Sequence, residues 1–301
     1  MTKIPTGPTI AHAYRFAFGH GFAVLRAIAL PLLAQLAVVF LLTRRSALFL
    51  AATAAHDPSA ATLVGPELLL IVLAVIFFFA QFTAVTEIAL GHPPHAWISF
   101  PFGKPMWRLL GGFATAIAVI AAIAVTASLI LMVLSVLFNL ATKNPGAVTP
   151  AAMAAAGATA VIFFCVMIFF FIRFLFLLAP VNVAERQLGV RRAWTLSAGN
   201  FWRAFLVSLA IMGPIIVINY AFSYAMAGPL HIPAGASPEA LQAAETVWRI
   251  NQLNAMADRW YLSLPLMGVL IWFQLGAGCA AQVFAWRALT EGERSQPVAA
   301  H

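Results

Sequence analysis

The sequence predicts an all-α protein, a polytopic membrane bundle of six transmembrane helices. Of its 301 residues 63% are hydrophobic and only 9% are charged, and the mean hydropathy is +0.94. About a quarter of the residues in a soluble domain are charged. The apolar residues gather in six segments long enough to cross a bilayer, and short aromatic and basic segments lie between several of them. A chain of this kind buries its apolar surface in lipid.

The spans can be placed because a helix needs about 20 apolar residues to cross the hydrocarbon core. The third span, at about 109–140, is longer than this and must tilt or project beyond the bilayer. Basic residues flank the first apolar run and five more runs follow it, so we expect an uncleaved span and not a signal peptide. We predict a single membrane domain over residues 1–301, with spans at about 22–42, 67–90, 109–140, 153–180, 204–228 and 261–289.

The basic residues divide unequally between the two faces of this bundle. One face holds the N-terminus, the 91–108 and 181–203 loops and the C-terminus, with twelve of the seventeen basic residues. The positive-inside rule places this face, and both termini, in the cytoplasm. Arg44 and Arg45 lie on the other face and oppose the rule locally. The twelve are Lys3, Arg15, Arg26, Lys104, Arg108, Arg173, Arg186, Arg191, Arg192, Arg203, Arg287 and Arg294.

Three aromatic–basic segments precede the first, third and fifth spans: "HAYRFAFGHGFAVLR" (12–26), "HAWISFPFGKPMWR" (95–108) and "RRAWTLSAGNFWR" (191–203). Trp, Tyr and Arg favour the head-group level of a membrane. We therefore expect short interfacial helices there, one of them over 183–198, with Gly19, Gly103 and Gly199 turning the chain into the next span. Either a helix-pair unit is repeated three times, or aromatic and basic residues gather at any membrane boundary without a repeat. The spacing between Trp and Arg differs among the three segments, so both interpretations stay open.

Two loops on the face opposite the termini are also predicted to contain helix. Residues 43–66 contain "SALFLAATAA", which favours a partly helical or membrane-hugging segment. In the 229–260 loop, Ser237 is a good N-cap, Pro238 suits the first helical position and Glu239 the first turn. A surface helix is expected to begin there.

Residues 170–205 carry a resemblance. The stretch "FIRFLFLLAPVNVAERQLGVRRAWTLSAGNFWRAF" has Arg173 near the end of a span, then Pro180, Glu185 and "AWTLSAGNFWR". It resembles a bacterial six-helix membrane family that includes the membrane-anchor domain of some glycerophosphoryl diester phosphodiesterases and stand-alone envelope proteins of unassigned function. The ending "AWRALTEGE" (285–293) also fits.

The resemblance implies a multi-pass module of the bacterial inner membrane. The phosphodiesterases carry a separate catalytic barrel, which takes about 250 residues. No such segment follows the last span here, so we expect that activity to be absent.

Two groups of residues are candidates for a site. Arg26, Glu87 and Arg173 are charges at or near membrane depth, all toward the cytoplasmic side. Such charges mark a gate or head-group site, or else a structural ion pair or snorkelling side chains, and a Glu87–Arg173 pair is one arrangement. The second group is the interfacial motif of Glu185, Arg191, Arg192, Trp194, Gly199, Asn200, Trp202 and Arg203.

Helix-breaking residues and side-chain amides occur within the predicted spans, and each group has two interpretations. Gly213-Pro214 and Pro265 either kink their helices or line a cavity. The amides Gln81, Asn139, Asn219 and Gln274 favour bonds between helices over substrate binding.

Several classes of function are not indicated by the sequence. Cys165 and Cys279 form no CxxC or Cys–His pattern, so no metal or cofactor is expected. The sequence contains no phosphate-binding loop and no nucleophile-elbow motif. The basic residues lie at the ends of apolar segments, which favours binding of anionic lipid over nucleic acid.

We predict no enzyme but a non-catalytic scaffold, partner subunit or envelope-maintenance module, whose partners are anionic lipid head groups and a membrane protein. The alternative is a transporter or lipid-handling protein with a cavity between the helix repeats.

Overall fold

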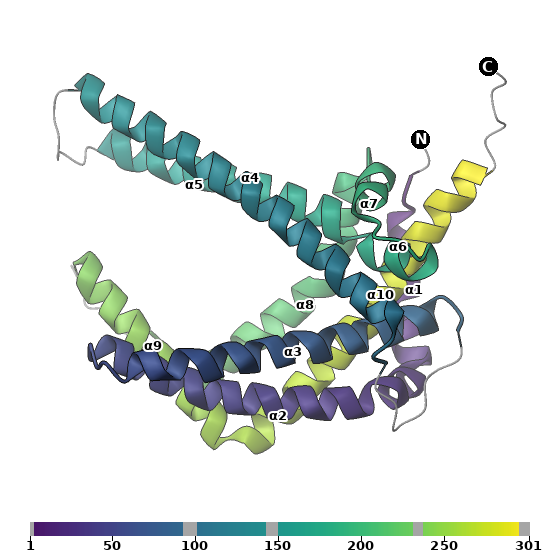
Figure 1. The fold of residues 1–301 in the computed structure, drawn as a ribbon, viewed down its shortest axis with the longest axis horizontal. Helices are drawn as coiled ribbons and strands as arrows, with labels where there is room; N and C mark the ends of the chain where they lie inside the picture. The colour runs from purple at the N-terminus through teal and green to yellow at the C-terminus, as the bar shows by residue number, and fades with distance from the viewer. Residues whose placement is uncertain (1–2, 93–100, 143–149, 231–236, 295–301) are drawn as a thin grey trace. The chain divides into compact units, whose positions relative to one another are not determined.

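The computed structural model describes residues 3–92, 101–142, 150–230 and 237–294, and every regular element in these ranges is a helix (Figure 1). The all-α prediction is confirmed. The helices are α1 (Thr6–Gly19), α2 (Gly21–Ala54), α3 (Ala60–Ala89), α4 (Lys104–Thr142), α5 (Pro150–Leu175), α6 (Leu178–Ala184), α7 (Val190–Leu196), α8 (Phe201–Ala227), α9 (Pro238–Asp258) and α10 (Trp260–Arg294).

Six helical stretches of the described chain are long and apolar enough to cross a membrane: α2, α3, α4, α5 continued by α6, α8 and α10. Each coincides with a predicted span, so the multi-pass class is confirmed. Helix α4 has 39 residues. At about 1.5 Å per residue it is longer than the hydrocarbon core, which is about 30 Å thick, as the third span was predicted to be.

The segment 43–66 is more helical than predicted. Helix α2 runs twelve residues past the predicted end at 42, because the alanines and leucines after Arg45 favour helix. It ends where His56 adopts φ +54°. The Asp57 carboxylate then accepts a hydrogen bond from the Ser59 amide at 2.8 Å, and α3 begins at once. The predicted outer loop is therefore a tight turn between two long helices.

Helix α9 begins as its sequence predicts. Ser237 has extended backbone, and its hydroxyl accepts a hydrogen bond from the Ala240 amide at 3.3 Å, with Pro238 as the first helical residue. The helix expected in the 229–260 loop is thus found, and its position on the membrane surface stays a prediction.

The described chain clusters into two compact units. Unit 1 comprises Met1–Thr6, Trp107–Leu206 and Gln282–His301, and unit 2 comprises Gly7–Met106 and Val207–Ala281. Helices α8 and α10 each contribute residues to both units. The prediction of a single domain over 1–301 therefore stays a prediction.

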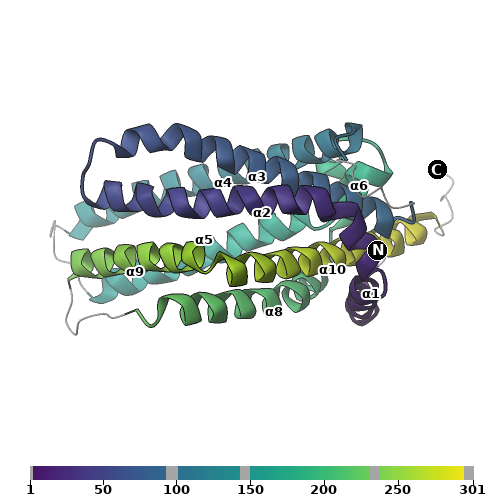
Figure 2. The same ribbon diagram turned by 90° about the horizontal axis from the view of Figure 1, so that it is seen from below.

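In unit 2, α2 packs along α3 and also contacts α9; Figures 1 and 2 show α2 and α3 side by side. Two buried amides join α2 to α3: Gln81 Nε2 donates to Gln35 Oε1 at 2.5 Å, and neither side chain is more than 8% exposed. The interpretation of Gln81 as a link between helices is thereby confirmed. Asn219 is exposed, and the Asn139 side chain lies outside the part of the chain that is described.

In unit 1, α5 contacts the two short helices α6 and α7. The single interfacial helix predicted over 183–198 is wrong. The chain there forms the end of α6, a break at 185–189 and then α7, because Arg186 adopts φ +55°, which stops a right-handed helix.

The three-fold repeat stays a prediction. Short helices precede α2 and α8, but residues 93–100 of the middle segment lie outside the described residues.

The Gln35–Gln81 pair can be tested by substitution. Gln35→Leu should lower the free energy of unfolding by about 0.6–2 kcal/mol, because the buried Gln81 amide loses its partner on α2. Gln35→Leu/Gln81→Leu should recover part of that loss, because no polar group is then left unpaired. Thermal unfolding in detergent measures these variants and the single variant Gln81→Leu. A double variant that loses the sum of the two single losses would show that the amides do not interact.

Candidate functional site

Residues 182–203, which we call the connector, join α6 to α8 and contain the whole predicted interfacial motif. A buried amide closes its first loop: Asn182 Oδ1 accepts a hydrogen bond from the Gly189 amide at 2.7 Å. Only glycine fits at 189, since a Cβ there would overlap the Val181 side chain. Gly199, with φ +71°, turns the chain from α7 into α8 as predicted.

Arg173 of α5 anchors the middle of the connector. Its guanidinium donates to the Trp194 carbonyl at 2.7 Å and, through Nε, to Ser197 Oγ at 3.3 Å. Its Cζ also lies 3.7 Å from the Trp194 ring centroid. The Ser197 hydroxyl is within hydrogen-bonding distance of the Arg173 carbonyl, at 3.1 Å. A charge that would be costly in the bilayer is thus satisfied by a ring face, a carbonyl and a hydroxyl of its own unit.

Aromatic rings hold Trp194 from the α5 side. Its indole stacks on Phe174, with ring centroids 4.6 Å apart, and on Phe170 at 5.8 Å. Phe169 approaches it edge-on at 6.3 Å. These contacts add dispersion and quadrupole attraction to the Arg173 bonds, so α7 is fixed on α5 by both polar and apolar groups.

Glu185 ties the connector to the last helix. Its Oε1 accepts a hydrogen bond from Trp286 Nε1 of α10 at 3.2 Å and lies 3.5 Å from Arg192 Nε. Its Oε2 accepts one from Gln187 Nε2 at 2.8 Å. Both carboxylate oxygens are therefore used within unit 1.

The connector also binds the N-terminal segment that precedes α1. Ile4 is fully buried, and its amide donates to Asn200 Oδ1 at 2.9 Å. Its carbonyl accepts from the Arg203 guanidinium at 2.8 Å. Arg203 and Asn200 thus satisfy both backbone groups of one residue about 200 positions earlier. The sequence contains no local signal for this contact.

Helix α4 meets the connector at two points. The Arg108 guanidinium donates to the Arg186 carbonyl at 2.7 Å. Gly112 faces Asn182 so closely that a Cβ at 112 would overlap the Asn182 amide. A side chain at 111, one residue earlier, would make only an ordinary contact with Leu188, at 3.5 Å.

The structure brings most of the predicted motif together and leaves part of it exposed. Glu185, Trp194, Asn200 and Arg203 bind residues of unit 1 outside the motif, and Arg192 pairs with Glu185 inside it. Arg191 is exposed, and Trp202 is 70% exposed.

The predicted membrane charges fall in different units. Arg26 and Glu87 belong to unit 2 and Arg173 to unit 1, so a Glu87–Arg173 pair stays a prediction. Arg26 Nε is buried without a hydrogen-bond partner in the described residues.

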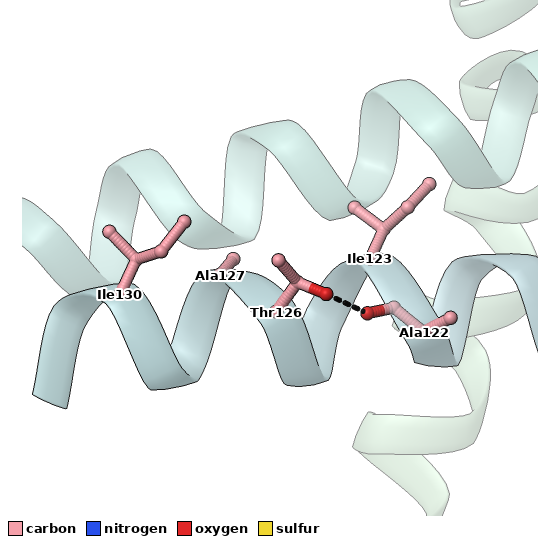
Figure 3. A pocket seen from close by; sticks show the side chains of 5 residues that line it. All are labelled: Ala122, Ile123, Thr126, Ala127 and Ile130. Atoms are coloured by element: carbon pink, nitrogen blue, oxygen red, sulfur yellow. Dashed lines mark hydrogen bonds between the residues drawn. The ribbon is translucent and has the colours of Figure 1, made fainter.

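Two cavities of the described chain are apolar, and Arg26, Glu87 and Arg173 line neither of them. One, of about 390 Å³, follows a face of α4 formed by Ala122, Ile123, Thr126, Ala127 and Ile130 (Figure 3). The only hydroxyl in this set, on Thr126, donates to the Ala122 carbonyl of its own helix at 2.8 Å. The other, of about 510 Å³, lies in unit 2 between α1, α2 and α10.

Among the described residues, no three His, Cys, Asp or Glu side chains lie close enough to hold a metal ion. Comparison with protein-family models, with curated proteins and with solved structures gave no match to this chain. The resemblance to the phosphodiesterase membrane-anchor family therefore stays a prediction.

Arg173 offers the first test of the connector. Arg173→Lys should lower the free energy of unfolding by about 1–3 kcal/mol, because an ammonium cannot stack on Trp194 and bond two acceptors as the planar guanidinium does. Arg191→Lys, at an exposed position of the same segment, is the control and should unfold like the wild type. Equal thermal unfolding of the two variants in detergent would show that Arg173 does not anchor the connector.

The adjacent glycines of α4 provide a matched pair. Gly112→Ala should destabilise the protein by about 1–3 kcal/mol, because its methyl group overlaps the buried Asn182 amide. Gly111→Ala should leave stability unchanged or slightly raised, since its methyl group fits and alanine favours helix. Both are measured by thermal unfolding, and equal effects would contradict the close approach of α4 to the connector.

Proposed function

We propose that this chain is a non-catalytic, multi-pass protein of the bacterial inner membrane that acts as a scaffold, partner subunit or envelope-maintenance module. The observation that carries the proposal is that polar groups of the connector, and the arginine of α5 that anchors it, already have partners inside the protein. Arg173, Glu185, Asn200 and Arg203 all bind the protein's own backbone or side chains. Groups that are occupied in this way build a rigid surface, which suits recognition.

Both termini in the cytoplasm form part of the proposal. Ile4 near the start of the chain and Trp286 near its end both bind the connector, and these contacts support placing all three parts on one side of the membrane. That side carries Arg186, Arg191 and Arg192, which supports its assignment to the cytoplasm by the positive-inside rule.

The exposed residues of the connector form its contact surface. Leu188 is 63% exposed and Trp202 70%, with Arg191 exposed between them in the sequence. Trp and Arg are enriched where proteins bind one another. Arg191 also suits anionic lipid head groups. A membrane protein docked on the cytoplasmic side is the partner that this composition favours.

The alternative, a transporter or lipid-handling protein, required a cavity lined by the predicted membrane charges. The two cavities described above are apolar and do not involve them. Their lining suits hydrocarbon and not a polar solute, which argues against transport of a polar solute, whereas lipid handling is decided by the vesicle experiment below.

Site-specific photo-cross-linking in growing bacterial cells tests the proposal. A photoreactive phenylalanine at Leu188 or Trp202 should give one discrete protein adduct, because these side chains face the partner. The same residue at Leu129 of α4, which is 57% exposed within a span, should give none at that mass. Absence of an adduct at both connector positions would contradict a partner there.

Reconstituted vesicles test the alternative. Purified protein in lipid vesicles should neither scramble fluorescent lipid nor release trapped solute faster than protein-free vesicles. Faster movement of either would overturn the scaffold proposal in favour of a transporter or lipid-handling protein.

A further inference from the structure

The apolar groove of unit 2 is built from three helices. Phe18 of α1, Phe22 and Leu25 of α2, and Gly268, Val269 and Trp272 of α10 line it, and its volume is about 510 Å³. That volume is within the range of small-molecule sites, about 300–1,000 Å³. The α2 and α10 residues belong to membrane-spanning helices.

The groove has a fixed wall. Trp272 Nε1 donates to the Gly21 carbonyl at 3.0 Å, which sets the orientation of the indole. A Cβ at Gly21 would lie 2.7 Å from the Trp272 ring, so glycine is required for the indole to lie against α2. The opposite rim is open, because Phe18, Phe22 and Val269 are 67%, 71% and 56% exposed.

An arginine accompanies each exposed phenylalanine of the rim. Arg15 precedes Phe18 by three residues on α1, and Arg26 follows Phe22 by four on α2. Residues at these spacings share a helix face. Arg15 is exposed, and Arg26 Nε is buried without a hydrogen-bond partner in the described residues. Each arginine therefore lies about one helical turn from an exposed phenylalanine that lines the groove.

We propose that this groove holds an acyl chain of one anionic phospholipid from the cytoplasmic leaflet, with Arg15 and Arg26 binding its phosphate. The apolar lining selects the chain, since a groove on membrane-spanning helices is filled from hydrocarbon. The two guanidinium groups select an anionic head group over a neutral one. The choice of leaflet rests on the membrane orientation given under the proposed function, whereas the site itself does not depend on the scaffold role.

Native mass spectrometry of the full chain tests the site. The protein is released from nanodiscs with equal amounts of phosphatidylglycerol and phosphatidylcholine. The wild type should retain one phosphatidylglycerol in preference to phosphatidylcholine. Val269→Trp, which fills the groove, should abolish that retention. Leu33→Trp adds the same bulk at a 64% exposed position of α2 outside the groove and should retain the lipid.

The charged residues are tested separately. Arg15→Gln and Arg26→Gln should each reduce phosphatidylglycerol retention about fivefold, as the loss of one cation at an anionic surface predicts. Arg44→Gln, at the other end of α2, should leave retention unchanged. Thermal unfolding is recorded for every variant, and Leu25→Trp, which fills the same groove, replaces Val269→Trp if the latter does not fold.

Equal retention of the two lipids by the wild type, or unchanged retention in Val269→Trp, would overturn the proposal. Neither result bears on the cross-linking of Leu188 and Trp202, so failure of the lipid site and failure of the scaffold role are distinguished.

Discussion

A positive charge near the end of a membrane helix either reaches the interface or is satisfied inside the protein, and the contacts that satisfy Arg173 organise the fold of unit 1. Its guanidinium lies over the Trp194 ring and binds the Trp194 carbonyl and the Ser197 hydroxyl. These bonds hold α7 against α5. Because α7 lies in the middle of the connector, the loop before it and the turn after it are fixed as well.

The fixed connector then gathers parts of the chain that are far apart in sequence. Glu185 binds Trp286 of α10, and Asn200 and Arg203 bind Ile4. Each bond gives a polar group a partner within unit 1. In unit 2 a buried pair of amides joins α2 to α3, and the Trp272 indole binds the Gly21 carbonyl. The first arrangement underlies the proposed recognition surface, and the Trp272–Gly21 contact forms a wall of the groove proposed to hold a lipid chain.

Some of these features could be predicted from sequence because their causes are local. The six spans follow from runs of apolar residues, and the start of α9 follows from Ser237 and Pro238. The break within 183–198 could not be predicted, because Arg186 adopts a left-handed conformation that its residue type does not favour. The bonds of Ile4 join residues about 200 positions apart. The groove exists because Gly21 and Trp272 meet in the folded chain, although each alone resembles an ordinary span residue.

Hydrogen–deuterium exchange of the protein in lipid nanodiscs, read out by mass spectrometry, tests most directly whether Arg173 holds the connector in place. The amides of residues 190–203 should exchange as slowly as those of the neighbouring span residues in the wild type. In Arg173→Ala they should exchange much faster, while those of α2 and α3 in unit 2 stay unchanged. Rapid exchange of 190–203 in the wild type, or the same slow exchange in the variant, would contradict a connector anchored by Arg173.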